Sequence, residues 1–204
     1  MLSAFAPLFS LAAIGAMAAL TPGPSFLLVS QIAMGRSRGQ ALMAVLGVVT
    51  SGVTWALATL VGLSALFAAA PWSHTALQVA GGGYLIYIGI QYWRTSAPPG
   101  GQPVEPPSGS AFLRGLMTDL LNPKCLAFFA SVFVLFIRPD SPLWIKWGAV
   151  ATVAVVGSTC YGLVALLLST PAVQKRYLAM RRPLERVCGT VMVAFGLRLI
   201  FGRS

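Results

Sequence analysis

The tetrapeptide Thr21-Pro22-Gly23-Pro24 interrupts an uncharged stretch that extends over residues 1–35. Such a stretch is long enough for a helix that crosses a bilayer, because one crossing takes roughly 20 apolar residues. Proline lacks the backbone N–H that continues a helix, so carbonyls that precede it lose their partners. In lipid, unpaired carbonyls are tolerated only where protein or a water-filled cavity surrounds them. The sequence therefore predicts a transmembrane helix that is broken at a cavity.

The composition of the whole chain is that of a membrane protein. Hydrophobic residues make up 57% and charged residues 9% of the chain, and the mean hydropathy is +0.81. A soluble domain carries about 25% charged residues. We predict an all-α integral membrane protein that forms a single domain over residues 1–204. Six transmembrane helices are expected at about residues 4–32, 41–69, 75–92, 111–137, 143–169 and 184–201.

Basic residues are distributed unevenly between the two sides that six spans would create. The connections on one side carry nine basic residues: Arg36, Arg38, Arg94, Arg114, Lys175, Arg176, Arg181, Arg182 and Arg186. The other side carries four: Arg138, Lys146, Arg198 and Arg203. The positive-inside rule makes the richer side cytoplasmic and places both termini outside. Topology and attraction to anionic lipid headgroups thus explain the net charge of +10, and we expect no nucleic-acid partner.

The two halves of the chain resemble each other. A linker rich in proline, at about residues 95–110, separates repeats of about residues 1–94 and 111–204. Matching residues occur in the same order in both: Leu20-Thr21-Pro22 with Leu121-Asn122-Pro123, Gly52 and Thr54 with Gly157 and Thr159, and Gly82 and Gly89 with Gly189 and Gly196. Each repeat has three spans, an odd number, so the second enters the membrane from the opposite side. We predict two inverted three-helix repeats with helices 1 and 4 broken, and the four glycines of spans three and six as packing surfaces.

The first break has the chemistry of a binding site. From Ser25 onward a new half-helix would begin, and its free N–H groups and positive dipole end suit an anion such as a carboxylate. A structural kink is the alternative. Two prolines around Gly23 exceed what a kink requires. We therefore assign Thr21, Pro22, Gly23, Pro24 and Ser25 to a substrate site.

The second break, Asn122-Pro123-Lys124, adds a charge to the middle of a span. A lysine at the centre of a membrane helix costs roughly 2.5–3.5 kcal/mol on insertion scales. Snorkelling to the surface is the alternative. Each end of the span is about 20 Å away at the helical rise, beyond comfortable reach. We therefore expect Lys124 to face the substrate cavity.

Other polar residues of the spans are candidates with open roles. Asp119 could pair with Lys124, bind an ammonium group, carry a proton, or be solvated near the interface. Hydroxyl groups on spans two and five could line the same cavity or satisfy neighbouring helices; they belong to Thr50, Ser51, Thr54, Ser158 and Thr159.

At these breaks the chain resembles the LysE/RhtB family of amino-acid exporters. The blocks that carry the resemblance are T-P-G-P at residues 21–24, G-G-G-Y-L-I-Y-I-G at 81–89, L-L-N-P-K at 120–124, and L-E-R-V-C-G-T-V-M-V-A-F-G-L-R-L at 184–199. The resemblance covers nearly the whole chain. It implies a six-span protein of the bacterial inner membrane that moves amino acids or close derivatives out of the cytoplasm. In such a membrane, the distribution of basic residues places both termini in the periplasm. The resemblance also implies that the proton-motive force powers this export.

The function expected from the sequence is a secondary carrier for a small zwitterionic amino acid in antiport with protons. Its substrate carboxylate would lie at residues 23–25 and Lys124, and its ammonium group at Asn122, Asp119 or exposed carbonyls. The oligomeric state is left open, a homo-oligomer included.

Two other functions are less well supported by the residues. A cation or metal exporter of the same architecture would need more buried carboxylates or a thiol cluster. Cys125, Cys160 and Cys188 are isolated and read as small buried hydrophobes, which also disfavours a membrane-embedded thiol oxidoreductase. His74 is the only histidine, so a hydrolase would lack an intramembrane base. We expect no catalytic residue, metal or cofactor.

Overall fold

The computed structural model describes residues 2–21, 23–35, 37–70, 72–94, 110–137 and 141–201. Every element in these ranges is an α-helix, which confirms the all-α prediction. The helices are α1 (Leu2–Leu20), α2 (Pro24–Gly35), α3 (Arg38–Ala69), α4 (Ser73–Arg94), α5 (Ala111–Leu120), α6 (Pro123–Phe136), α7 (Leu143–Leu167) and α8 (Pro171–Phe201).

Two of the predicted spans are broken where the sequence indicated. The first divides into α1 and α2, whose axes differ by 57°, and the second into α5 and α6. Pro24 and Pro123 are the first residues of α2 and α6, where a missing N–H leaves no helical bond unmade. Pro22 lies outside the described residues. Proline chemistry thus both ends one half-helix and starts the next.

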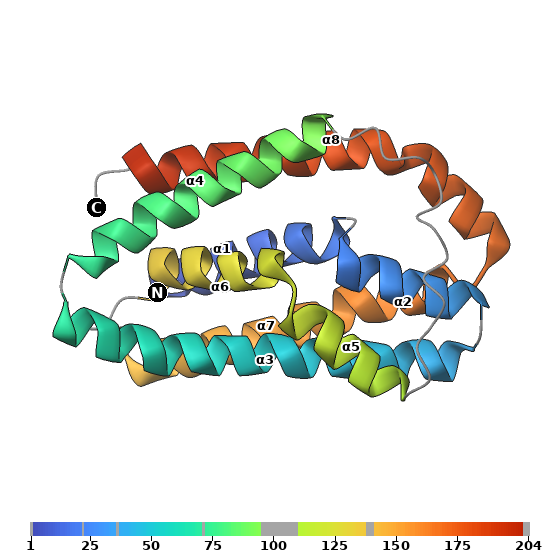
Figure 1. The fold of residues 1–204 in the computed structure, drawn as a ribbon, viewed down its shortest axis with the longest axis horizontal. Coiled ribbons are helices and arrows are strands. Elements are labelled where there is room, and N and C mark those ends of the chain that lie inside the picture. Colours follow the sequence, from blue (N-terminus) through green and yellow to red (C-terminus); the bar gives the residue numbers. More distant parts are fainter. Residues whose placement is uncertain are drawn as a thin grey trace.

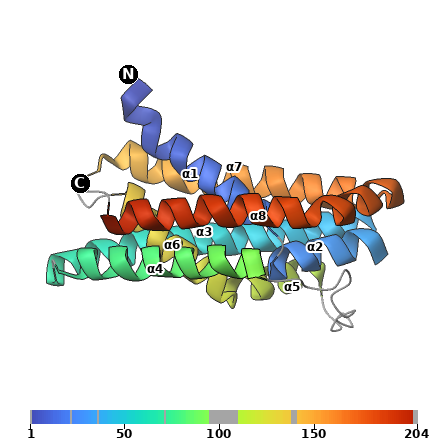
Figure 2. The same cartoon turned by 90° about the horizontal axis from the view of Figure 1, so that it is seen from above.

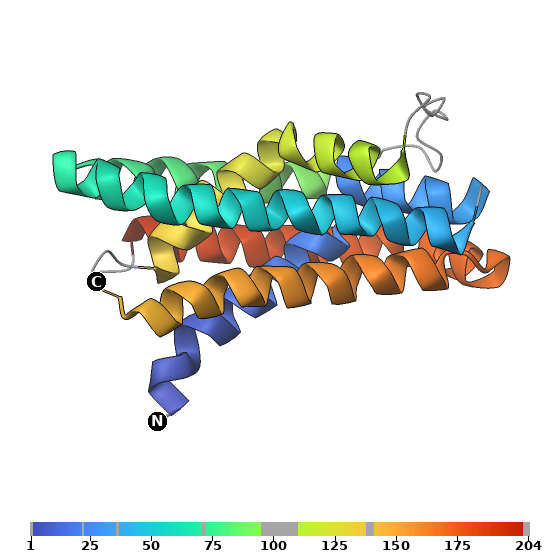
Figure 3. The same ribbon diagram turned by 90° about the horizontal axis from the view of Figure 1, so that it is seen from below.

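The helices form a bundle with the two breaks in its interior. Figure 1 shows α4 beside α8 and α3 beside α7, each pair antiparallel, with α1, α2 and α6 between these pairs and α5 against α3; Figures 2 and 3 show the same pairs from above and below. The start of α1 and the end of α8 lie at the same end of the bundle (Figure 1). This arrangement brings the two breaks together in the interior.

Close helix contacts depend on glycine. A Cβ atom at Gly82 of α4 would lie 2.9 Å from the carbonyl oxygen of Gly196 in α8, and one at Gly89 would lie 2.6 Å from that of Gly189. No side chain fits at such distances, so the backbones of α4 and α8 touch through these residues. The prediction that the four glycines are packing surfaces is confirmed.

Helix α8 differs from the predicted sixth span. The apolar pattern placed its start near residue 184, whereas the helix begins at Pro171 and continues through Pro183. The added segment carries exposed basic residues, among them Lys175, Arg176 and Arg182. Hydropathy locates the part of a helix that suits lipid, and it does not detect a helical extension with a polar surface.

By length and hydropathy, α3 and α7 could each cross a membrane, and α1 with α2 could form a third, bent crossing. This test covers the described residues alone. Two apolar clusters lie to either side of the breaks. One joins α2, α3 and α7 around Phe26 and Val48, and the other joins α1, α3, α6 and α7 around Leu11 and Phe129. The region between these clusters holds the candidate site.

Candidate substrate site

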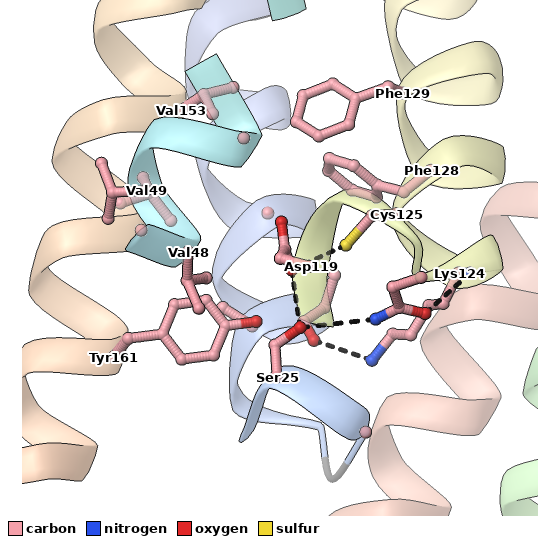
Figure 4. A pocket seen from close by; sticks show the side chains of 18 of the residues that line it. Ser25, Val48, Val49, Asp119, Lys124, Cys125, Phe128, Phe129, Val153 and Tyr161 are labelled. Carbon is pink, nitrogen blue, oxygen red and sulfur yellow. Dashed lines mark hydrogen bonds between the residues drawn. The ribbon is translucent and has the colours of Figure 1, made fainter. Parts of the chain in front are cut away.

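A cavity of about 90 Å³ lies where the two breaks meet. Residues of α1, α2, α3, α5, α6 and α7 line it, together with the connecting residues of both breaks. A single water molecule needs roughly 10–15 Å³ of such space, so the cavity has room for several waters or one small organic molecule. Figure 4 shows its polar side chains gathered on one side and apolar side chains on the other.

Lys124, the second residue of α6, caps the C-terminal end of α1. Its Nζ donates hydrogen bonds to the carbonyl oxygens of Ala18, at 3.0 Å, and Thr21, at 3.4 Å. In an unbroken helix the Ala18 carbonyl would accept the N–H of residue 22, but residue 22 is a proline. The positive charge also complements the negative end of the α1 dipole. Lys124 therefore points into the bundle and not toward a headgroup.

Gly23 packs closely against this contact. A Cβ atom there would lie 3.3 Å from Nζ and 3.6 Å from Cδ of Lys124. A side chain larger than hydrogen would require the Lys124 side chain to shift by a few tenths of an ångström. The glycine between the two prolines thus leaves room for the charge supplied by the second break.

Asp119 of α5 sits at the opposite end of the same break. Its side chain is buried, with 3% exposure, and its Oδ1 accepts hydrogen bonds from Ser25 Oγ at 2.6 Å and Cys125 Sγ at 3.0 Å. Ser25 is the second residue of α2, so the carboxylate lies at the positive end of that half-helix. Of the roles left open by the sequence, solvation near the interface does not describe this buried group.

The position of Asp119 follows from a close helix crossing one turn earlier. A Cβ atom at Gly115 would lie 2.0 Å from the carbonyl oxygen of Ala44, so α5 and α3 are in backbone contact there. This contact holds α5 against α3, with Gly115 and Asp119 on its buried face, and carries Asp119 to the break. The end of α2, where we expected a substrate carboxylate, holds the carboxylate of the protein itself.

Asn122 connects the two breaks and begins α6. Its Oδ1 accepts the backbone N–H of Lys124 at 3.0 Å, as an N-cap side chain does, ahead of proline at the first helical position. Its Nδ2 donates to Ser25 Oγ at 3.4 Å. A chain of hydrogen bonds therefore runs from Asn122 through Ser25 to Asp119 (Figure 4).

The structure brings most of the predicted site residues together. Thr21, Gly23, Ser25, Asp119, Asn122 and Lys124 all line the cavity. Thr21 also donates its hydroxyl hydrogen to the carbonyl of Met17 in the last turn of α1. Pro24 and Pro123 flank these residues as the first positions of their helices.

The five hydroxyl residues of spans two and five lie elsewhere. Thr50 and Thr54 are exposed, and each donates to a carbonyl one turn earlier in α3. Ser158 and Thr159 are exposed on α7, and Ser51 is buried away from the cavity. None of the five is among the cavity-lining residues. The faces of α3 and α7 that line the cavity carry mainly glycine and valine, with Thr152 and Tyr161 as the hydroxyl residues of α7 that do line it.

Several lining residues were not identified from the sequence. Cys125, read as a small buried hydrophobe, contacts the Asp119 carboxylate, and Phe128 and Phe129 form an aromatic wall with ring centroids 5.3 Å apart. Their positions within two turns of the second break were the available signal. Among the described residues, no three His, Cys, Asp or Glu side chains are grouped in a way that could hold a metal ion.

The sequence matches known proteins along almost its whole length. A family model described as LysE type translocator matches residues 16–203. The threonine efflux protein of Escherichia coli (strain K12) is 35% identical over 193 residues, covering 92% of this chain and 94% of the relative. The threonine efflux protein of Salmonella typhi is 33% identical over 201 residues, covering 96% and 98%. The leucine efflux protein of Salmonella choleraesuis (strain SC-B67) is 28% identical over 188 residues, covering 88% of each. No solved structure matches the chain.

Proposed function

Because the chain belongs to the LysE type translocators, a family of transporters and not of enzymes, we propose that it exports a small amino acid from the cytoplasm. Relatives that align over nearly the full chain are named for the efflux of threonine and of leucine, which supports an amino-acid substrate. The observation that carries the proposal is the cavity between two broken helices, with one acidic and one basic side chain at its polar side.

A zwitterion complements this polar side. Oδ1 of Asp119 is already engaged by Ser25 and Cys125, and Figure 4 shows the other carboxylate oxygen directed toward the cavity. We assign the substrate ammonium group to that oxygen; the Asn122 amide oxygen accepts the Lys124 backbone N–H instead. The substrate carboxylate would lie beside the Lys124 ammonium group, whose charge acts at a distance without requiring a free donor.

Competition between a proton and the substrate ammonium group for the Asp119 carboxylate would couple export to protons. An ammonium group binds the ionised form of Asp119, whereas a proton neutralises it. The two cannot be held together, so each inward proton releases one substrate. Buried acidic residues in membrane spans serve transport in this way. Asp119 is therefore the proposed coupling residue for proton antiport.

The arrangement of the helices supports inverted repeats and alternating access. The broken pair α1–α2 runs along the bundle in one direction and α5–α6 in the other (Figure 1). If the repeats match α1, α3 and α4 to α5, α7 and α8, then the contact between α3 and α5 corresponds to the contact between α7 and α1. In the pairs α3–α7 and α4–α8, each helix contacts its own counterpart in the other repeat. We propose six crossings of the inner membrane with periplasmic termini, and rocking of one repeat against the other. The exposed basic residues of α8 would then meet anionic headgroups on the cytoplasmic side.

Transport into everted membrane vesicles tests the proposal. Vesicles from cells with and without the protein are energised and given an equimolar mixture of amino acids, and their contents are measured by mass spectrometry. We expect accumulation of small neutral amino acids that depends on the protein and ends when a protonophore is added. If no amino acid accumulates above the protein-free control, export is refuted.

A further inference from the structure

The apolar side of the cavity has a lining suited to a side chain. Phe128 and Phe129 of α6 face it from one direction and Val49 of α3 and Val153 of α7 from another (Figure 4). Among the described residues that line the cavity, Asp119 is the one acidic group, and it lies with Lys124 on the polar side. A ligand bound at that side would extend its remaining atoms toward the apolar lining.

Two glycines determine how much space this lining leaves. Gly52 of α3 and Gly157 of α7 both line the cavity. A Cβ atom at Gly52 would lie 3.3 Å from Cγ1 of Val153, and one at Gly157 would lie 3.4 Å from Cγ2 of Val49. The contacts are reciprocal: Gly52 faces the valine one turn before Gly157, and Gly157 faces the valine one turn before Gly52. A methyl group at either position would therefore occupy the space between α3 and α7.

We infer that Gly52 and Gly157 form the floor of a side-chain subsite that admits short, uncharged side chains. This inference rests on the proposed export function and specifies its substrate class. Gly82, Gly89 and Gly196 hold helices in backbone contact, whereas Gly52 and Gly157 face valine side chains and line the cavity.

The chemistry of the lining explains the exclusion of charged side chains. A lysine or glutamate side chain would bring a second charge among valine and phenylalanine, and burying an unpaired charge is strongly unfavourable. The hydroxyl of Thr152 at this side is engaged by the Gly148 carbonyl at 2.7 Å. A lining of this type discriminates weakly between valine and threonine, which have nearly the same shape.

Alanine substitutions test the subsite through selectivity. Gly52→Ala and Gly157→Ala each add one methyl group to the floor. In the vesicle assay we expect the ratio of valine to glycine transport to fall about tenfold or more, since one methylene in an apolar pocket changes discrimination by roughly 10–200-fold. Glycine transport should stay within about threefold of its original rate, because glycine has no side chain to enter the subsite and the polar side of the site is unchanged.

The same two helices provide matched controls. Gly62 on α3 and Gly162 on α7 have no atoms within 4 Å of an added Cβ. Gly62→Ala and Gly162→Ala should therefore leave the valine-to-glycine ratio unchanged. A similar ratio change in these controls would contradict the assignment, as would an equal loss of every amino acid in Gly52→Ala and Gly157→Ala.

Variants that enlarge the subsite provide a second test if Gly52→Ala or Gly157→Ala fails to accumulate in the membrane. Val153→Ala and Val49→Ala should raise transport of leucine relative to valine, because they remove atoms that face the glycine floor. An unchanged leucine-to-valine ratio would overturn the subsite while the unaltered protein still exports amino acids. If the unaltered protein moves no amino acid, the failure belongs to the proposed function.

Discussion

Replacing Lys124 with methionine separates the role of its charge from that of its bulk. The substitution removes the donor to the Ala18 and Thr21 carbonyls while keeping a long, flexible side chain. A hydrogen bond from a charged group contributes about 1.5–3 kcal/mol, and the contact at 3.4 Å contributes less than the one at 3.0 Å. Relief from burying an ammonium group in a membrane span returns roughly 2.5–3.5 kcal/mol. The two effects nearly cancel, so we expect little change in protein abundance.

Transport should respond much more strongly than abundance. Removing one partner of a buried, hydrogen-bonded charge pair costs about 2–5 kcal/mol of binding, and each 1.4 kcal/mol is about a factor of ten. Lys124→Met should therefore weaken substrate transport by more than tenfold per molecule of protein. Lys124→Arg keeps the charge with a different shape and hydrogen-bonding geometry, and should restore part of the activity.

The assay combines vesicle transport with quantitative immunoblotting of the membranes. Lys175→Met is the matched control, because Lys175 is exposed on α8 and its substitution removes an equal charge outside the cavity. Normal transport per molecule by Lys124→Met would refute a role for this charge in recognition. A parallel fall of abundance and transport would instead assign Lys124 to stability alone.

Three further results are expected. The double substitution Pro22→Ala and Pro24→Ala should restore helical hydrogen bonding across the first break and abolish export while membrane insertion persists; normal export would mean that the break is a kink. Asp119→Asn cannot take up a proton, so its residual export should no longer respond to a protonophore, and a response equal to that of the unaltered protein would place coupling elsewhere. A reporter that functions only in the periplasm should be active when it is fused to either terminus; activity of a reporter that functions only in the cytoplasm would reverse the predicted topology.

Much of the candidate site could be predicted from local chemistry. Proline removes a donor wherever it stands, so the positions of both breaks follow from residues 22–24 and 122–123 alone. A lysine too far from either surface to snorkel must face protein or water, which placed Lys124 at the cavity. The hydroxyl residues were less predictable, because a difference of one residue turns a helical side chain by about 100°. Gly52 and Thr50 lie two residues apart, and only the first lines the cavity.

The sequence by itself determined an all-helical membrane protein with two broken helices and a charged residue beside the second break. Only the tertiary structure decided which partners the broken ends acquire. Lys124 meets Ala18 across 106 residues of chain, and Asp119 meets Ser25 across 94. Such pairs depend on how α5 and α6 are placed against α1 and α2, which backbone contacts such as Gly115 against Ala44 fix. A missing N–H is a property of one residue, whereas the donor that replaces it is a property of the packed bundle.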